Sequence, residues 1–246
     1  MTTILVTGGT GTLGRLVTER LRADGAEVRV LSRHARPYAV DLREGTGLAS
    51  AVAGVDTVVH CASSPRGGDE QAARNLIAAA REAGVRHLVY ISIVGVDRVP
   101  FPYYRAKLAV ERLVEESGLG WTLLRTTQFH DLVLRVLQAS AKLPVMLLPA
   151  GVADQPIEVA EVAERLAGLA VGAPAGRVAD MGGPEVRTFP ELARAFLRAS
   201  DRHRRLLNVP LAGSAYRAFR AGGHLTPERA VGTVTFERFL AERFPG

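Results

Sequence analysis

The sequence predicts an α/β fold, a doubly wound parallel sheet in a three-layer sandwich with a small C-terminal lobe. Through the first 125 residues, short runs rich in β-branched residues alternate with longer segments of helical periodicity. Because parallel crossovers are almost always right-handed, this alternation puts helices on both faces of one sheet. The 246 residues fit one large domain, and 47% hydrophobic and 23% charged residues are typical of a chain with a sizeable core.

The first expected strand, residues 4–6, leads through a glycine-rich turn into a helix that ends at Gly25. The apolar residues of that helix recur at helical spacing. Further strands are expected at 28–31, 39–40, 57–60, 87–92 and 121–125, and further helices at 72–83 and 105–116. Later in the chain we expect a helix at 129–141, a strand at 145–148 and a helix at 158–171, followed by a remainder punctuated by Gly and Pro.

The formal charge of +6 is unevenly distributed. Residues 187–229 contain nine arginines and three acidic residues, whereas the rest of the chain is formally neutral. This segment has no helix-turn-helix signature, and its aromatic residues recur at helical intervals typical of packing. We therefore expect a solvated surface and no nucleic-acid binding; an entrance for an anionic substrate is the alternative.

The single cysteine, Cys61, excludes an intramolecular disulfide and fits a reducing compartment. The N-terminus lacks the pattern of a signal peptide, and no apolar stretch approaches the roughly 20 residues needed to cross a bilayer. No Cys/His spacing suggests a metal site. We expect a cytoplasmic protein with no metal and no membrane association.

A glycine turn, Thr7-Gly8-Gly9-Thr10-Gly11-Thr12-Leu13-Gly14, lies between the first expected strand and the first expected helix. Gly8 permits the tight turn, Gly11 lets the backbone approach a pyrophosphate, and Gly14 lets the helix pack closely on the strand. The phosphates would meet free N–H groups at the helix N-terminus, where the helix dipole favours negative charge. This context predicts a dinucleotide-binding Rossmann sheet. The expected cofactor contacts in the turn are Gly8, Thr10, Gly11, Thr12, Leu13 and Gly14.

The end of the second strand determines which dinucleotide binds. An acid there accepts hydrogen bonds from an unmodified ribose, whereas a basic residue accommodates a 2′-phosphate. The sequence has no acid at this place and reads Leu31-Ser32-Arg33-His34-Ala35-Arg36. Because Arg33 can bind a phosphate bidentately while Ser32 donates a hydroxyl, we predict NADP(H) rather than NAD(H). The alternative is an Arg33 that is merely solvated.

Further motifs follow the expected strands: Asp41-Leu42, Cys61-Ala62-Ser63, Ile91-Ser92, Tyr103-Tyr104-Arg105-Ala106-Lys107 and the segment 117–125. Together with the glycine turn they resemble the atypical short-chain dehydrogenase/reductases, specifically the NmrA-like NAD(P)-binding branch, over nearly the whole chain. The resemblance implies that Asp41 and Leu42 lie near the adenine. It also implies that Ala62 and Ser63 pass under the adenosine side of the cofactor, with Ser92 as a further cofactor contact.

Tyr103 and Lys107 lie four residues apart at the start of an expected helix, so both project from one face. A nearby ammonium lowers the pKa of a tyrosine, and Lys107 can do so while it binds the nicotinamide ribose. By resemblance this pair is catalytic, with Tyr103 passing a proton to an oxygen that becomes negative as hydride arrives. In the alternative, Tyr103 packs at the helix N-terminus and Lys107 only binds the ribose.

The catalytic set departs from that of a full reductase. A Ser or Thr usually lies two residues beyond the serine that ends the fifth strand, and here that position is Val94. Only eight residues separate Val94 from Tyr103, which makes Tyr104 the alternative proton donor.

Residues after the sixth strand are expected to reach the substrate crevice. Phe129 would lie against the nicotinamide, and Gln128 or His130 would orient a substrate oxygen. A structural hydrogen-bonding role for His130 is the alternative. We expect His60, inside a strand, to belong to the core.

A weakened catalytic set suits an acceptor whose reduced form tolerates negative charge. A quinone gives a stabilised phenolate, whereas a simple ketone gives an alkoxide and needs a strong proton donor. We therefore predict an NADPH-dependent reductase of a small quinone or another conjugated aromatic carbonyl. The resemblance agrees and adds polyketide quinones whose reduced form is then hydroxylated by oxygen.

Two alternatives remain open. The first is a non-catalytic NADP(H)-sensing regulator of the NmrA type that signals through a partner protein. The second is an isomerase or epimerase that holds its cofactor tightly. In either case we expect an NADP-binding core at residues 1–150 and a C-terminal lobe at 151–246, packed as one compact unit over the carboxyl edge of the sheet. The oligomeric state stays open.

Overall fold

The computed structural model describes residues 2–64 and 66–245, and the chain forms two compact units. Unit 1 runs to Ser92 and takes up Pro102–Arg125 and Ala160–Ala179. Unit 2 holds Ile93–Phe101, Thr126–Val159 and the chain from Asp180 onward. This division differs from the boundary predicted at residue 150, because the chain passes back and forth between the units and the helix after residue 158 belongs mainly to unit 1.

Unit 1 is built on a seven-stranded sheet with the order β3-β2-β1-β4-β5-β6-β9. Its strands are β1 (Thr3–Thr7), β2 (Glu27–Ser32), β3 (Tyr38–Ala39), β4 (Thr57–His60), β5 (His87–Ile93), β6 (Gly120–Thr126) and β9 (Gly176–Arg177). β1 pairs in parallel with β2 on one side and β4 on the other, so the strand order reverses beside the end of β1. The first six strands have the order of doubly wound dinucleotide-binding sheets, which confirms the predicted fold class.

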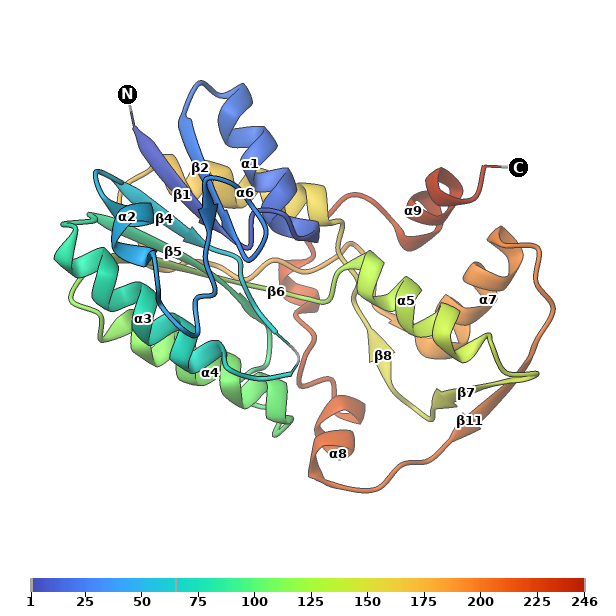
Figure 1. Cartoon of the computed structure of the whole chain (residues 1–246). Helices are drawn as coiled ribbons and strands as arrows, with labels where there is room; N and C mark the ends of the chain where they lie inside the picture. Colours follow the sequence, from blue (N-terminus) through green and yellow to red (C-terminus); the bar gives the residue numbers. More distant parts are fainter. Residues whose placement is uncertain (1, 65, 246) are drawn as a thin grey trace. The chain divides into compact units, whose positions relative to one another are not determined.

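Helices cover both faces of this sheet (Figure 1). They are α1 (Thr12–Ala23), α2 (Leu48–Val52), α3 (Asp69–Glu82), α4 (Pro102–Glu115) and α6 (Val159–Val171). Helices α2, α3 and α4 lie on one face, and α1 and α6 on the other. Every strand and helix predicted before residue 172 is present within three residues at each end, whereas the short α2 was not predicted.

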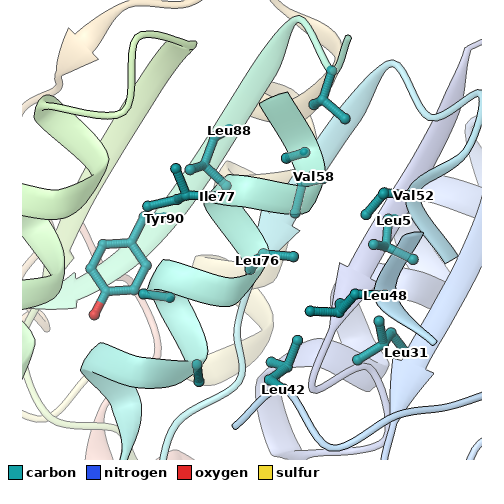
Figure 2. Close-up of a cluster of buried hydrophobic side chains, with 14 of the residues drawn as sticks. Leu5, Leu31, Leu42, Leu48, Val52, Val58, Leu76, Ile77, Leu88 and Tyr90 are labelled. Atoms are coloured by element: carbon teal, nitrogen blue, oxygen red, sulfur yellow. The ribbon is translucent and has the colours of Figure 1, made fainter. Parts of the chain in front are cut away.

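The core between the sheet and α2, α3 and α4 follows the alternation of the strands. Leu5, Val58 and Leu88 come from neighbouring strands and point to the same face, where Leu48 and Leu76 meet them (Figure 2). All five side chains are buried. Their burial holds the strand ends, and therefore the loops that leave them, in fixed positions.

An ion pair lies within unit 1. Arg125 on β6 donates to Glu111 on α4 through Nε at 2.9 Å and through an Nη at 2.6 Å. The two side chains are only 6% and 3% exposed. A buried pair with this bidentate geometry fixes α4 against the sheet, because removing one partner would leave the other charge in the interior.

Unit 2 has two small sheets, β7 (Val145–Pro149) paired with β11 (Arg205–Val209) and β8 (Ala153–Asp154) paired with β10 (Arg187–Thr188). Its helices are α5 (His130–Ser140), α7 (Phe189–Ala199), α8 (Ser214–Arg220), the 3₁₀ turn η1 (Pro227–Arg229) and α9 (Phe236–Arg243). The sequence prediction described the region after residue 171 only as a punctuated remainder and missed α7, α8 and α9. In α7 a signal was available, since Thr188 and Glu191 form a capping box ahead of an apolar face.

No helix within the described part of the chain is long and apolar enough to span a membrane.

Candidate functional site

The glycine turn between β1 and α1 has the geometry that the sequence predicted. Gly8 has φ +66°, a conformation that side chains rarely adopt, and its N–H donates to the carbonyl of Leu31 at 2.9 Å. A Cβ added at Gly8 would lie 2.8 Å from both Cα and N of Ala62, in the loop after β4. The turn therefore lies directly against the backbone of that loop, and only glycine fits there.

Gly14 provides the second close approach. A Cβ at Gly14 would meet the carbonyl carbon of Gly8 at 2.8 Å and Cα of Gly9 at 2.9 Å, so α1 packs tightly on the turn. Helix α1 begins after Gly11, with no side-chain cap and no acidic residue in its first turn. Its first N–H groups have no partner within the helix, and the helix dipole favours an anion at this end. The arrangement fits a pyrophosphate.

A cleft of about 530 Å³ opens beside this turn, at the carboxyl ends of the strands of unit 1. It brings together most of the predicted cofactor residues: Gly8, Thr10, Gly11, Ser32, Arg33, Asp41, Leu42, Ala62 and Ser63. The remaining predicted residues of the turn, Thr12, Leu13 and Gly14, begin α1 and do not line the cleft. Leu13 is 7% exposed and belongs to the core.

Three arginines line the cleft: Arg33 after β2, Arg43 after β3 and Arg66 after β4. All three are exposed, and none has an ion-pair partner among residues 2–64 and 66–245. Cations without carboxylate partners at a cleft favour an anionic ligand. The sequence analysis identified only Arg33. Arg33 directly follows β2, whereas Arg43 lies four residues beyond the end of β3 and Arg66 six beyond the end of β4, so the available signal was a basic residue in a loop that follows a strand.

Tyr103 belongs to a hydrogen-bonded chain. Its hydroxyl lies 2.8 Å from Oγ of Ser63, and Ser63 donates to Oδ2 of Asp69 at 2.5 Å. Because a serine hydroxyl has one proton and Asp69 accepts it, Tyr103 is the donor to Ser63. Asp69 is 6% exposed and also accepts from the N–H of Ser64 at 2.8 Å. The sequence analysis missed Asp69 because it lies six residues beyond Ser63, at the start of α3.

The structure corrects the expected electrostatics of Tyr103. Burial is the largest cause and raises the pKa of its hydroxyl, and the Asp69 carboxylate raises it further, although the side-chain hydrogen bond with Ser63 acts in the opposite direction. The predicted lowering of the tyrosine pKa by Lys107 is therefore wrong. The charge that acts on Tyr103 is the Asp69 carboxylate rather than the Lys107 ammonium.

Lys107 is 4% exposed and lies beside the C-terminal end of β5. Its Nζ donates to the carbonyl of Ile91 at 3.0 Å and lies 4.7 Å from the ring centre of Tyr90. Burial lowers the pKa of Lys107 to about 8, while Asp69 partly offsets this effect. The amine is therefore held at the end of β5, and its predicted contact with a ribose remains a prediction.

The neighbours of this pair are also placed. Ser92 is the last residue of β5 that belongs to unit 1, one position before the end of the strand. It is 1% exposed, and its Oγ has no hydrogen-bond partner among the described residues. Tyr104 is 4% exposed, as is Lys107. His60 is buried as predicted. Its Nδ1 lies 2.7 Å from Oγ1 of Thr7, and burial lowers its pKa to about 3.

The three predicted substrate residues lie in unit 2. His130 is 1% exposed, and its Nε2 donates to the carbonyl of Val234 at 2.9 Å. This agrees with the alternative of a structural hydrogen-bonding role. Gln128 and Phe129 are half-buried. Phe129 forms an isolated parallel β-bridge with Ile157, and the carbonyl of Gln128 accepts from the N–H of Ile157 at 2.9 Å. Within the described ranges, no three His, Cys, Asp or Glu side chains are grouped to hold a metal ion.

Comparison with known proteins agrees with this geometry. A sequence profile of the NAD(P)H-binding family matches residues 8–168. The chain belongs to this family. The match begins at the first glycine of the turn and ends within α6, and it confirms the predicted nicotinamide dinucleotide as the cofactor class.

Several curated relatives of the chain carry the names of reductases or oxidoreductases. The chain is 34% identical over 236 residues to a (4-alkanoyl-5-oxo-2,5-dihydrofuran-3-yl)methyl phosphate reductase of Streptomyces griseus, covering 87% of this chain and 80% of that protein. It is 27% identical over 216 residues to quinone oxidoreductase 2 of Escherichia coli, covering 81% and 75%. The crystal structure of an NADPH-dependent quinone oxidoreductase of Escherichia coli with NADPH has a TM-score of 0.82 at 22% identity, covering 98% and 99% of the two chains. The named relatives agree with the predicted reductase class, and the structural likeness confirms the fold.

Proposed function

We propose that the protein is an NADPH-dependent reductase that transfers a hydride to a quinone or another conjugated aromatic carbonyl. Its relatives in Streptomyces griseus and Escherichia coli carry the names of reductases of an unsaturated lactone phosphate and of quinones. Both names describe conjugated carbonyl compounds. The observation that carries the substrate class is Val94, a fully buried apolar residue where a full reductase has a hydroxyl.

The residues of the cleft fit the dinucleotide. The glycine turn and the start of α1 would hold the pyrophosphate, and Arg33 with Ser32 would hold a 2′-phosphate. Asp41, Leu42, Ala62 and Ser63 would enclose the adenosine. When bound, the cofactor supplies the hydride. We further propose that Thr10 and Thr12 donate to its phosphates.

Tyr103 and Lys107 have separate roles in this proposal. Lys107 binds the nicotinamide ribose and Ser92 lies beside the same end of the cofactor. Tyr103 holds the proton that the reduced substrate takes up, since its raised pKa keeps the hydroxyl protonated at neutral pH. A tyrosine with a raised pKa is a weak acid, which suits an acceptor whose anion is stabilised by conjugation. Tyr104 remains the second proposed proton donor.

The proposed substrate is a small aromatic molecule. Gln128 and Phe129 are proposed to contact it, and the segment 151–246 is proposed to determine its identity. The finest form of the proposal is a polyketide quinone whose reduced form is then hydroxylated by oxygen. This form extends the proposed reductase activity.

Steady-state oxidation of NADPH with a panel of quinones tests the proposal. We expect oxidation above the rate without enzyme for at least one quinone, and a lower rate with NADH. Tyr103→Phe should lower kcat, while Lys107→Ala should also raise the KM for NADPH. The proposed reaction is refuted if NADPH binds measurably and no quinone is reduced.

A second candidate function is an NADP(H)-sensing regulator that does not turn its cofactor over. One observation favours it, since both groups already have hydrogen-bond partners within the protein. The Tyr103 hydroxyl is bonded to Ser63, and the Lys107 amine donates to the Ile91 carbonyl. A sensor should keep its response to NADPH in Tyr103→Phe, for example the resistance of the chain to proteolysis. An enzyme should lose rate in the same variant.

A further inference from the structure

Arg43 differs from the other cleft arginines because its backbone is fixed on both sides. Its N–H donates to Oδ1 of Asp41 at 2.9 Å, and its carbonyl accepts from Nδ2 of Asn75 at 2.9 Å. The same Asn75 amide donates to the carbonyl of Leu42, also at 2.9 Å. Gln71 donates to Oδ1 of Asn75 at 2.8 Å and so holds that amide in place. The side chain of Arg43 therefore starts from a defined point at the rim.

The side chain of Arg43 reaches the loop on the other side of the cleft. A Cβ added at Gly68 would lie 2.8 Å from both Cδ and Nε of Arg43 and 3.3 Å from Cζ. Arg43 and Gly68 both line the cleft. The guanidinium is therefore packed on a glycine backbone at the start of α3. This contact joins the loop after β3 to the loop after β4.

Three buried apolar residues line the cleft close in the chain to this contact, Val40 and Leu42 before Arg43 and Ala72 after Gly68, and they are 5%, 7% and 8% exposed. The phosphate end is elsewhere, at the glycine turn and the start of α1, and Arg33 follows β2 between the two ends. If the pyrophosphate lies at the turn and the 2′-position lies at Arg33, the adenine is the remaining part of the adenosine half. The adenine is therefore the part that would meet these apolar residues. An uncharged, planar adenine suits such walls.

We propose that Arg43 covers the adenine ring of the bound dinucleotide, its planar guanidinium stacking on the base. Guanidinium groups stack on aromatic faces, and the contact gains strength where water is excluded. Because both dinucleotides contain adenine, Arg43 binds them equally, whereas Arg33 distinguishes them by the 2′-phosphate. The proposal rests only on dinucleotide binding and requires no turnover.

Fluorescence titration with NADPH and with NADH, in the absence of any electron acceptor, tests the proposal. Arg43→Ala should weaken both by the same factor, about threefold to thirtyfold, and leave their ratio unchanged. Arg43→Lys keeps the charge and loses the plane, so it should weaken both nearly as much. Arg33→Ala should weaken NADPH alone. Arg81→Ala, an exposed arginine at the end of α3, is the matched control and should change neither affinity.

Three results would overturn the proposal. A loss for NADPH alone in Arg43→Ala would make Arg43 a phosphate ligand. Wild-type affinities in Arg43→Lys would show that charge alone acts. Unchanged affinities in Arg43→Ala would remove Arg43 from the site. Since no substrate is present, a failure of quinone reduction would refute the proposed reaction and leave these binding results standing.

Discussion

Replacing Gly8 by alanine tests whether the close approach of the glycine turn to the loop after β4 positions the cofactor site. Gly8 has φ +66°, and the added Cβ would lie 2.8 Å from Cα and N of Ala62 and 3.1 Å from the carbonyl carbon of Cys61. All three are backbone atoms, so no side chain can rotate away. One of the two loops has to move.

The expected loss of stability has two parts. The left-handed conformation costs an alanine about 1–2 kcal/mol. Overpacking against fixed neighbours costs about 1–3 kcal/mol more. We therefore expect Gly8→Ala to lower the free energy of unfolding by about 2–5 kcal/mol, and to weaken NADPH binding because the turn is displaced.

Gly54 offers a matched control in the same unit. Its φ is +69°, and an added Cβ would meet nothing within 4 Å. Gly54→Ala should therefore show the conformational part alone, about 1–2 kcal/mol, with unchanged NADPH affinity. Urea unfolding of both variants measures the difference, and fluorescence titration measures binding. Equal losses of stability in Gly8→Ala and Gly54→Ala, with equal NADPH affinities, would refute the reasoning.

Three further predictions concern charge. Arg33→Ala should raise the Kd for NADPH by about tenfold to a hundredfold and leave that for NADH unchanged, because only NADPH has the 2′-phosphate; equal losses in titrations would contradict it. Glu111→Ala leaves Arg125 buried and should lower the free energy of unfolding in urea by about 3–5 kcal/mol. Glu164→Ala removes an exposed partner of Arg20 and should lower the free energy of unfolding by less than about 1 kcal/mol. Similar losses of stability in Glu111→Ala and Glu164→Ala would argue against a buried charge. Burial holds the folded-state pKa of His60 at about 3, below its ordinary 6.5, so the unfolded chain binds the extra proton and stability falls as the pH drops between these values. His60→Asn should flatten that decline by about 1.4 kcal/mol per pH unit in unfolding curves at about pH 4–6, and an unchanged slope would contradict the assignment.

The sequence was sufficient where the signal is local. The glycine turn is recognised within eight residues, and its strand and helix follow from apolar periodicity. Arg33 was found because it directly follows a strand. Arg43 and Arg66 lie four and six residues beyond the ends of β3 and β4, so they were not found by this rule and needed a search of the whole loops.

The sequence was insufficient where the contact joins distant segments. The Tyr103 hydroxyl and Ser63 are 40 residues apart, and Asp69 reaches Tyr103 only through Ser63. From spacing alone Lys107 was the expected neighbour of Tyr103, and this gave the wrong direction for the pKa of the tyrosine. Which charge faces a side chain depends on how α3 and α4 pack side by side, and no local pattern contains that information.

By itself the sequence determined a Rossmann sheet and its glycine turn, and it predicted a pyrophosphate at that turn and a 2′-phosphate at Arg33. These features depend on residues that are neighbours along the chain, where conformation and spacing are set by the backbone. The tertiary structure alone decided that Asp69 acts on Tyr103, that Lys107 is held by the end of β5, and that Arg43 spans the cleft to Gly68. Those contacts arise only when the core positions the loops, because their partners lie on separate elements.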